Sequence, residues 1–155
     1  MVYEWLKIIH VLSASVLFGT GLGTAFYMFY VNLQKDVALI ARATQQVVLA
    51  DWLFTGTSGV VQALTGFSLV GRGGYSFTDF WVWGSVVGYL IAGACWLPVV
   101  YLQIRCRDLA LQAMRDQTPL PIIYYRCYKL WLMLGVPAFL SLVVVFFLMT
   151  NRPVW

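Results

Sequence analysis

The stretch that decides the fold is residues 80–104, FWVWGSVVGYLIAGACWLPVVYLQI, which contains no Asp, Glu, Lys or Arg. Three further stretches without these residues cover positions 8–34, 52–71 and 130–151. Each reaches the roughly 20 residues that an α-helix needs to cross a bilayer. The strands of a membrane barrel would span only about 9–11 residues and would alternate in polarity. The sequence therefore predicts an all-α fold, an integral membrane four-helix bundle.

The composition also indicates a chain that lies in lipid. Of the 155 residues, 61% are hydrophobic and 10% are charged, with a mean hydropathy of +0.80. Soluble domains carry about 25% charged residues, so the composition excludes a soluble globular domain, a disordered chain and a coiled coil. In so apolar a chain, the net charge of +4 indicates membrane topology. The expected partner is the lipid bilayer, and nucleic acid is not expected.

We expect a single transmembrane domain over residues 1–155, with helices at about residues 3–33, 38–70, 79–115 and 121–150. Gly73-Gly74 should interrupt the chain between the second and third helices, and Thr78 should cap the third. Pro121 suits the first turn of the fourth helix. The first charge-free stretch is too long for a cleaved signal peptide, and no clear A-x-A site follows it.

The basic residues predict which side of the membrane each end of the bundle faces. Four spans put both termini on one side with three basic residues, whereas the other side carries seven. By the positive-inside rule, the side with seven basic residues is cytoplasmic, and both termini of this multi-pass protein are outside. The seven cytoplasmic cations are Lys35, Arg42, Arg105, Arg107, Arg115, Arg126 and Lys129. Aromatic residues should mark the interfaces, with Trp5, Trp81, Trp83 and Trp155 outside and Tyr124, Tyr125 and Tyr128 inside.

His10, the only histidine, lies about two helical turns inside the first span, roughly 10 Å into the membrane. An ionisable group at this depth is a candidate functional residue and must find a partner. One interpretation is an axial ligand to haem iron, because imidazole is the usual haem ligand in helix bundles. The other is a hydrogen bond across helices to Gln62, Ser85 or Tyr89.

For the haem interpretation, Lys7 lies one turn outward from His10 and is placed to meet a propionate. Arg72 and Arg152 lie on the same side of the membrane. Met149 is the candidate second ligand, with a packing role as its alternative. A five-coordinate haem and ligation across a dimer are also open.

Asp51 is the only acidic residue well inside the apolar region, where an unpaired carboxylate is costly. An ion pair with Arg105, Arg126 or Lys129 would fix the bundle. The functional alternatives are a proton relay and a contact with a substrate. Because His10 and Asp51 lie in opposite halves of the membrane, we do not expect them to form one catalytic dyad.

Small residues and prolines give weaker indications. The pairs Gly19/Gly23 and Gly84/Gly88 predict close helix packing, and they permit a homodimer. Pro98 and Pro137 should kink the third and fourth helices. The chain has three cysteines, in places that do not suggest a disulfide framework.

Five blocks of sequence resemble an uncharacterised bacterial membrane family, domain of unknown function 2269. They are residues 5–10 (WLKIIH), 21–26 (GLGTAF), 48–55 (VLADWLFT), 93–100 (GACWLPVV) and 134–139 (LGVPAF). The WLKxxH start is more distantly similar to HemJ-type protoporphyrinogen oxidases and CopD-like copper-resistance domains. The HemJ resemblance implies haem b at His10 and, more weakly, a role for Lys7. HemJ-type chains carry a further histidine where this chain has Val31-Asn32, and Asn-Glu where it has Leu134-Gly135.

Taken together, the sequence and its resemblance to HemJ-type proteins predict a haem b protein with a redox role, in electron transfer or in porphyrin or quinone oxidoreduction. The resemblance to a bacterial membrane family implies a multi-pass protein of the bacterial inner membrane, with both termini on the periplasmic side. A quinone or redox partner is then expected, and a HemJ-like oxidoreductase activity is left open. Two alternatives belong to other classes. One is a small-molecule or ion transporter that uses Asp51, and the other is an accessory membrane subunit without a cofactor.

Overall fold

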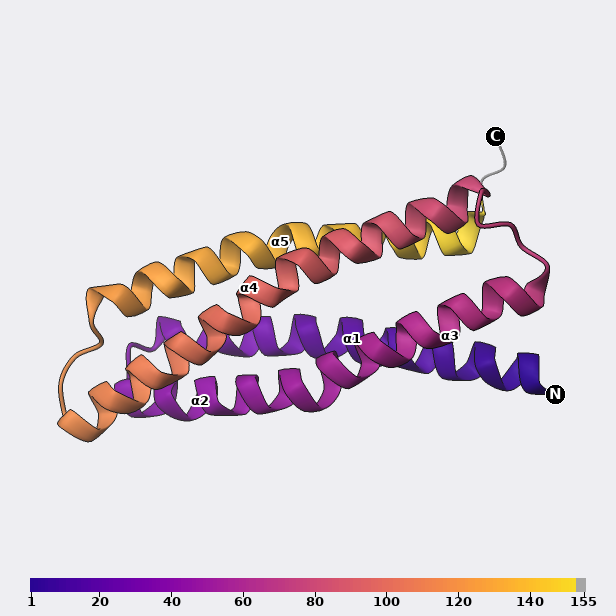
Figure 1. The fold of residues 1–155 in the computed structure, drawn as a ribbon. Helices are drawn as coiled ribbons and strands as arrows, with labels where there is room; N and C mark the ends of the chain where they lie inside the picture. Colours follow the sequence, from indigo (N-terminus) through magenta and orange to yellow (C-terminus); the bar gives the residue numbers. More distant parts are fainter. Residues whose placement is uncertain (153–155) are drawn as a thin grey trace.

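The computed structural model describes residues 1–152, all of whose regular elements are helices (Figure 1). Trp155 lies outside the described residues. The elements are α1 (Val2–Leu33), α2 (Val37–Ala50), the π-helical turn η1 (Asp51–Gly56), α3 (Thr57–Gly73), α4 (Phe80–Asp116) and α5 (Ile122–Asn151). Because α2, η1 and α3 run on without a break, four helices are long and apolar enough to cross a membrane. The predicted all-α bundle with four spans is confirmed.

The N-terminus, the end of α5 and the α3–α4 connection lie at one end of the bundle, here called the terminal end (Figure 1). The other two connections lie at the opposite end, here called the basic end because the seven cations named above lie toward it. The side of the membrane that each end faces stays a prediction of the positive-inside rule.

The connections are short and have clear local causes. Gly74 has φ +71°, a left-handed conformation that glycine adopts without steric cost, and it ends α3 as predicted. The predicted cap at Thr78 is wrong: Asp79 occupies the N-cap of α4, and its carboxylate accepts the Ser76 N–H at 3.1 Å. Asp36 caps α2 by accepting the Leu39 N–H at 2.9 Å.

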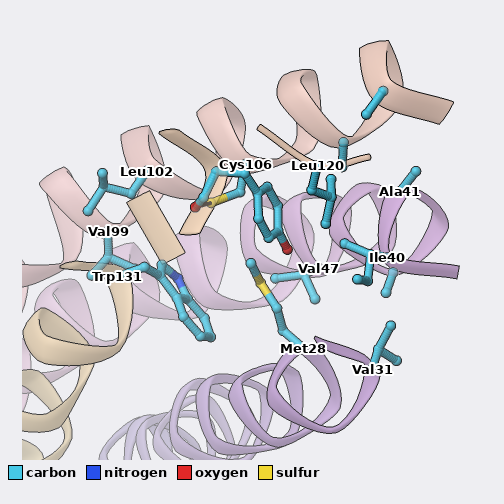
Figure 2. Packing of buried hydrophobic residues seen from close by; sticks show 14 residues of the cluster. Met28, Val31, Ile40, Ala41, Val47, Val99, Leu102, Cys106, Leu120 and Trp131 are labelled. Atoms are coloured by element: carbon cyan, nitrogen blue, oxygen red, sulfur yellow. Dashed lines mark hydrogen bonds between the residues drawn. The ribbon is translucent and has the colours of Figure 1, made fainter. Parts of the chain in front are cut away.

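The hydrophobic core lies in the half of the bundle nearest the basic end (Figure 2). It joins the last part of α1, α2, the last part of α4 and the start of α5. Tyr124 was expected at the inner interface but is completely buried, and its hydroxyl donates to Asn32 Oδ1 at 2.8 Å. The fully or almost fully buried members of the core include Met28, Ile40, Ala41, Val47, Cys106 and Ala110.

Toward the terminal end the bundle is organised as two helix pairs, α1 with α3 and α4 with α5. Glycines bring the second pair together, because Cβ atoms added to Gly84 and Gly88 would lie 3.0 Å from Leu148 and 2.7 Å from Val145. The predicted packing role of these two glycines is therefore confirmed, and it is fulfilled within the chain. In contrast, a Cβ on Gly19 or Gly23 would meet nothing within 4 Å, so the close packing predicted for this pair is not found within residues 1–152.

We expect Gly88→Ala to lower the melting temperature of the detergent-solubilised protein. The added methyl would meet Val145 Cγ2, and overpacking of this kind costs about 1–3 kcal/mol. Gly93→Ala is the matched control, since Gly93 lies on the same helix with no atom within 4 Å of its added Cβ. Both changes gain the same helix propensity. Equal melting temperatures for the two variants would contradict the close α4–α5 contact.

Candidate functional site

A buried polar seam follows one face of the continuous η1–α3 helix. It consists of Asp51, Thr55, Ser58, Gln62 and Thr65, and none of these residues is more than 8% exposed. Their alternating spacing of four and three residues keeps them on one side of a helix. Along the helix axis the seam extends roughly 20 Å, most of the thickness of a hydrocarbon core. Buried polar groups inside a membrane bundle are costly and usually serve a function.

The seam begins in a π-helical turn, Asp51–Gly56, where the sequence predicted an unbroken α-helix. Such turns are rare and occur frequently at functional sites. Within it, the Thr55 hydroxyl is buried and has no hydrogen-bond partner among the described residues. Buried hydroxyls are nearly always paired, so an unpaired one beside Asp51 marks this turn as unusual.

At the terminal end of the seam, His10 is hydrogen-bonded through both ring nitrogens. Its Nε2 lies 3.0 Å from the Gln62 amide nitrogen and its Nδ1 lies 2.8 Å from Thr65 Oγ1. Since an amide nitrogen can only donate, Nε2 is assigned as the acceptor and Nδ1 as the N–H donor. Gln62 Oε1 in turn accepts the Ser13 hydroxyl at 2.6 Å. The expected cross-helix bond to Gln62 is thus present, whereas Ser85 donates to the Trp81 carbonyl and Tyr89 to that of Gly59.

The residues around His10, as arranged here, do not fit a haem. An axial ligand needs a free ring nitrogen, and Gln62 and Thr65 occupy both. Helices α1 and α3 also approach closely at this level, where a Cβ on Gly66 would lie 3.2 Å from the imidazole. A groove between α1 and α3 that is lined by Ile9 and Ser13 has a volume of about 230 Å³, below that of usual ligand pockets, roughly 300–1,000 Å³. Haem ligation by His10 stays a prediction, which an absorption spectrum decides.

The other residues predicted around the haem are not gathered at His10. Lys7 pairs with Glu4 at 3.0 Å and lies over the Tyr3 ring. Arg152 donates to the Tyr75 hydroxyl at 2.7 Å, and Arg72 is exposed. Met149 is partly buried on α5, whereas both ring nitrogens of His10 face α3. No cluster of three or more His, Cys, Asp or Glu side chains suited to a metal occurs in residues 1–152.

At the other end of the seam, Asp51 is held by neutral donors. Trp96 Nε1 donates to Asp51 Oδ2 at 3.0 Å. The oxygen and nitrogen of the Gln103 amide are assigned so that both find partners. The nitrogen then donates to Asp51 Oδ2 at 3.1 Å, and the oxygen accepts from Trp131 Nε1 at 3.1 Å. Asp51 is 4% exposed, Gln103 3% and Trp131 4%. This set of four side chains is called the Asp51 cluster below.

The expected ion pair of Asp51 with Arg105, Arg126 or Lys129 is not formed. The salt bridges found within residues 1–152 are Lys7–Glu4 and Arg107–Asp108. The three cations are exposed, since they lie toward the basic end where their charges can stay hydrated. Hydrogen bonds from the Trp96 indole and the Gln103 amide take the place of a counter-ion.

One contact between α3 and α4 lies at a level between the two ends of the seam. The Tyr89 hydroxyl on α4 donates to the Gly59 carbonyl on α3 at 2.5 Å. Gly59 lies between Thr55 and Gln62 on the same helix, and the absence of a side chain there lets the phenol reach the backbone. Hydroxyl groups on α3 and α4 therefore occupy the level between His10 and Asp51.

Sequence reasoning found His10, Asp51 and Gln62 but missed most of their partners. Thr55, Ser58 and Thr65 carried a usable signal, because their spacing places them on the face of Asp51 and Gln62. Trp96, Gln103 and Trp131 carried none, since their approach to Asp51 depends on how separate helices pack.

No curated protein and no solved structure matches this chain. The distant similarity to HemJ-type and CopD-like proteins therefore stays a prediction. A family model described as a predicted integral membrane protein matches residues 4–153, almost the whole chain. Its reach agrees with the five blocks noted in the sequence and with the four helices of membrane-spanning length. The chain therefore belongs to the DUF2269 family of integral membrane proteins.

Proposed function

We propose that this protein conducts protons across the bacterial inner membrane. The observation that supports this is the buried polar seam, which has Asp51 at one end and His10 hydrogen-bonded at the other. Chains of Asp, Glu and His inside membrane bundles typically serve as proton relays. The seam supplies one protonatable group in each half of the bundle.

The side chains between the two groups suit protons better than larger cargo. Thr55, Ser58 and the Tyr89 phenol carry hydroxyls, which accept and donate hydrogen bonds, as a proton relay requires. The seam is closely packed, with each of its side chains at least nine-tenths buried. By helix rise, Asp51 and Gln62 are about 17 Å apart, so several transfers are needed between the ends.

The surroundings of Asp51 also favour a mobile proton. A carboxylate fixed by a lysine or arginine stays ionised, whereas the donors at Asp51 are neutral indole and amide groups. Such a carboxyl group can exchange a proton without breaking a buried ion pair. This distinguishes it from a structural Asp, which would be paired with a cation.

Proton flux into proteoliposomes tests the proposal directly. With a potassium gradient, valinomycin and an internal pH dye, we expect wild-type protein to acidify or alkalinise the lumen faster than protein-free vesicles. Gln62→Leu should reduce this flux about tenfold, because it removes the amide that joins His10 to Ser13. Gln112→Leu is the matched control, since Gln112 is exposed on α4.

Wild-type flux equal to that of protein-free vesicles would contradict the proposal. The same purified sample is used for a reduced-minus-oxidised absorption spectrum. A Soret band and a b-type α band that disappear in His10→Ala would instead support the haem interpretation and an electron-transfer role. A sample without flux or colour that purifies with a larger complex would favour an accessory subunit.

A further inference from the structure

A groove at the basic end lies between α2 and α4, on the outside of the bundle and away from the polar seam. Its volume is about 480 Å³. Leu49, Trp52 and Leu111 provide its apolar lining, whereas Gln45, Arg107 and Asp108 provide its polar lining. Leu49 and Trp52 are 64% and 57% exposed, so the apolar part of the groove is open to whatever surrounds the protein.

The position of the groove places it at the boundary between lipid tails and head groups. The charge-free stretch of α4 ends at Ile104, and Arg105 and Arg107 follow directly. α4 has 37 residues. Its length is therefore about 55 Å, against a hydrocarbon core of roughly 30 Å, so its last turns extend beyond the tails. An open apolar surface at this boundary is covered by an acyl chain and not by water.

The charges around the groove select the head group. Arg107 contacts the neighbouring carboxylate of Asp108 at 2.8 Å, with an Arg107 side chain that is still 32% exposed. Arg42 precedes Gln45 by about one helical turn on α2, and Arg115 follows Leu111 by about one turn on α4. Three arginines therefore lie in or within about one helical turn of the lining, whereas Asp108 is its acidic residue. Basic sites of this kind between membrane helices bind anionic head groups.

We propose that this groove binds an anionic phospholipid, with the phosphate at Arg107 and an acyl chain along Leu49 and Trp52. The bilayer supplies this ligand, and the groove matches both parts of it: planar guanidinium groups for a phosphate and apolar side chains for a tail. The inference rests on the groove and its charges, and it holds whether or not the protein moves protons.

Native mass spectrometry of the full-length protein in detergent tests the site. The probes are phosphatidylglycerol and phosphatidylcholine with identical acyl chains, added at increasing concentration. We expect phosphatidylglycerol to bind at least about fivefold more tightly than phosphatidylcholine, and we expect Arg107→Gln to remove this preference. Arg126→Gln is the matched control, because Arg126 is exposed at the same end on α5. Glycerol 1-phosphate, which has no acyl chain, should not bind measurably.

A second variant keeps the test valid if Arg107→Gln folds poorly. Leu49→Gln changes a side chain that is 64% exposed, so it disturbs no core contact, and it should weaken the binding of both lipids. Equal affinity for the two lipids in the wild type would overturn the proposal. So would a preference that survives Arg107→Gln in a folded protein, or glycerol 1-phosphate binding as tightly as the lipid.

Discussion

Proteoliposomes that contain Asp51→Asn are expected to show proton flux close to that of protein-free vesicles, at least about tenfold below wild type. The Asn side chain does not take up or release a proton in the pH range of the assay, but it can keep the local structure. Both Trp96 and Gln103 donate to Asp51 Oδ2, so an Asn oxygen in that position accepts the same two hydrogen bonds. The substitution therefore removes the protonatable group while it preserves the packing of the Asp51 cluster.

Asp36→Asn is the control for this variant, because it makes the same chemical change at an exposed helix cap. Asn is as good an N-cap as Asp, so this variant should fold and conduct like the wild type. The melting temperatures of both variants are measured before reconstitution, so that loss of flux is separated from loss of fold. Wild-type flux through a folded Asp51→Asn protein would exclude Asp51 from the proton pathway.

Gln103→Leu is expected to cause a large loss of stability. Gln103 donates to Asp51 and accepts from Trp131, so leucine leaves a buried carboxylate oxygen one donor short and a buried indole N–H without an acceptor. Each group left without a partner costs about 1–3 kcal/mol. In a chain of this size, the melting temperature should fall by roughly 5 °C or more.

Gln112→Leu provides the comparison, since it makes the same change at an exposed position of the same helix. Thermal unfolding followed by circular dichroism in one detergent measures both variants. Gln103→Glu is informative as well, because it keeps an acceptor for Trp131 but places a second acid beside Asp51. A melting temperature for Gln103→Leu equal to that of Gln112→Leu would show that this network contributes little to the fold.

The helices were predictable because charge in a bilayer is expensive. Each charge-free stretch lies almost entirely inside one continuous helix. Most of the charged residues that bound these stretches lie near helix ends, with Asp51, Arg105 and Lys129 as the exceptions. The connection at Gly73-Gly74 followed from the conformational freedom of glycine. The π-helical turn at Asp51 was not predictable, because no local pattern distinguishes it from an α-helix.

The titratable residues of the candidate site could be predicted from the sequence, but their hydrogen-bond partners could not. A lone His and a lone Asp in apolar stretches stand out by composition. Which partners satisfy them depends on how α1 packs against α3 at His10 and how α4 passes η1 at Asp51. It therefore depends on side chains such as Trp96, which look like ordinary lipid-facing residues in the sequence. The predicted ion pair between Asp51 and a cation of the basic end was wrong for the same reason. It was inferred from opposite charge alone, without regard to whether those cations could stay hydrated.

The placement of the core in one half of the bundle has a consequence for access to the seam. Local openings of a protein are least costly where few side chains are buried together. Asp51 lies beside the densely packed half, next to Val47 and Val48. His10 lies outside this core, in the half where α1 packs mainly against α3 and α4 mainly against α5. Brief separations of the helices should therefore expose His10 to solvent often and Asp51 seldom. Proton exchange with solvent should then be rapid at His10 and rate-limiting at Asp51.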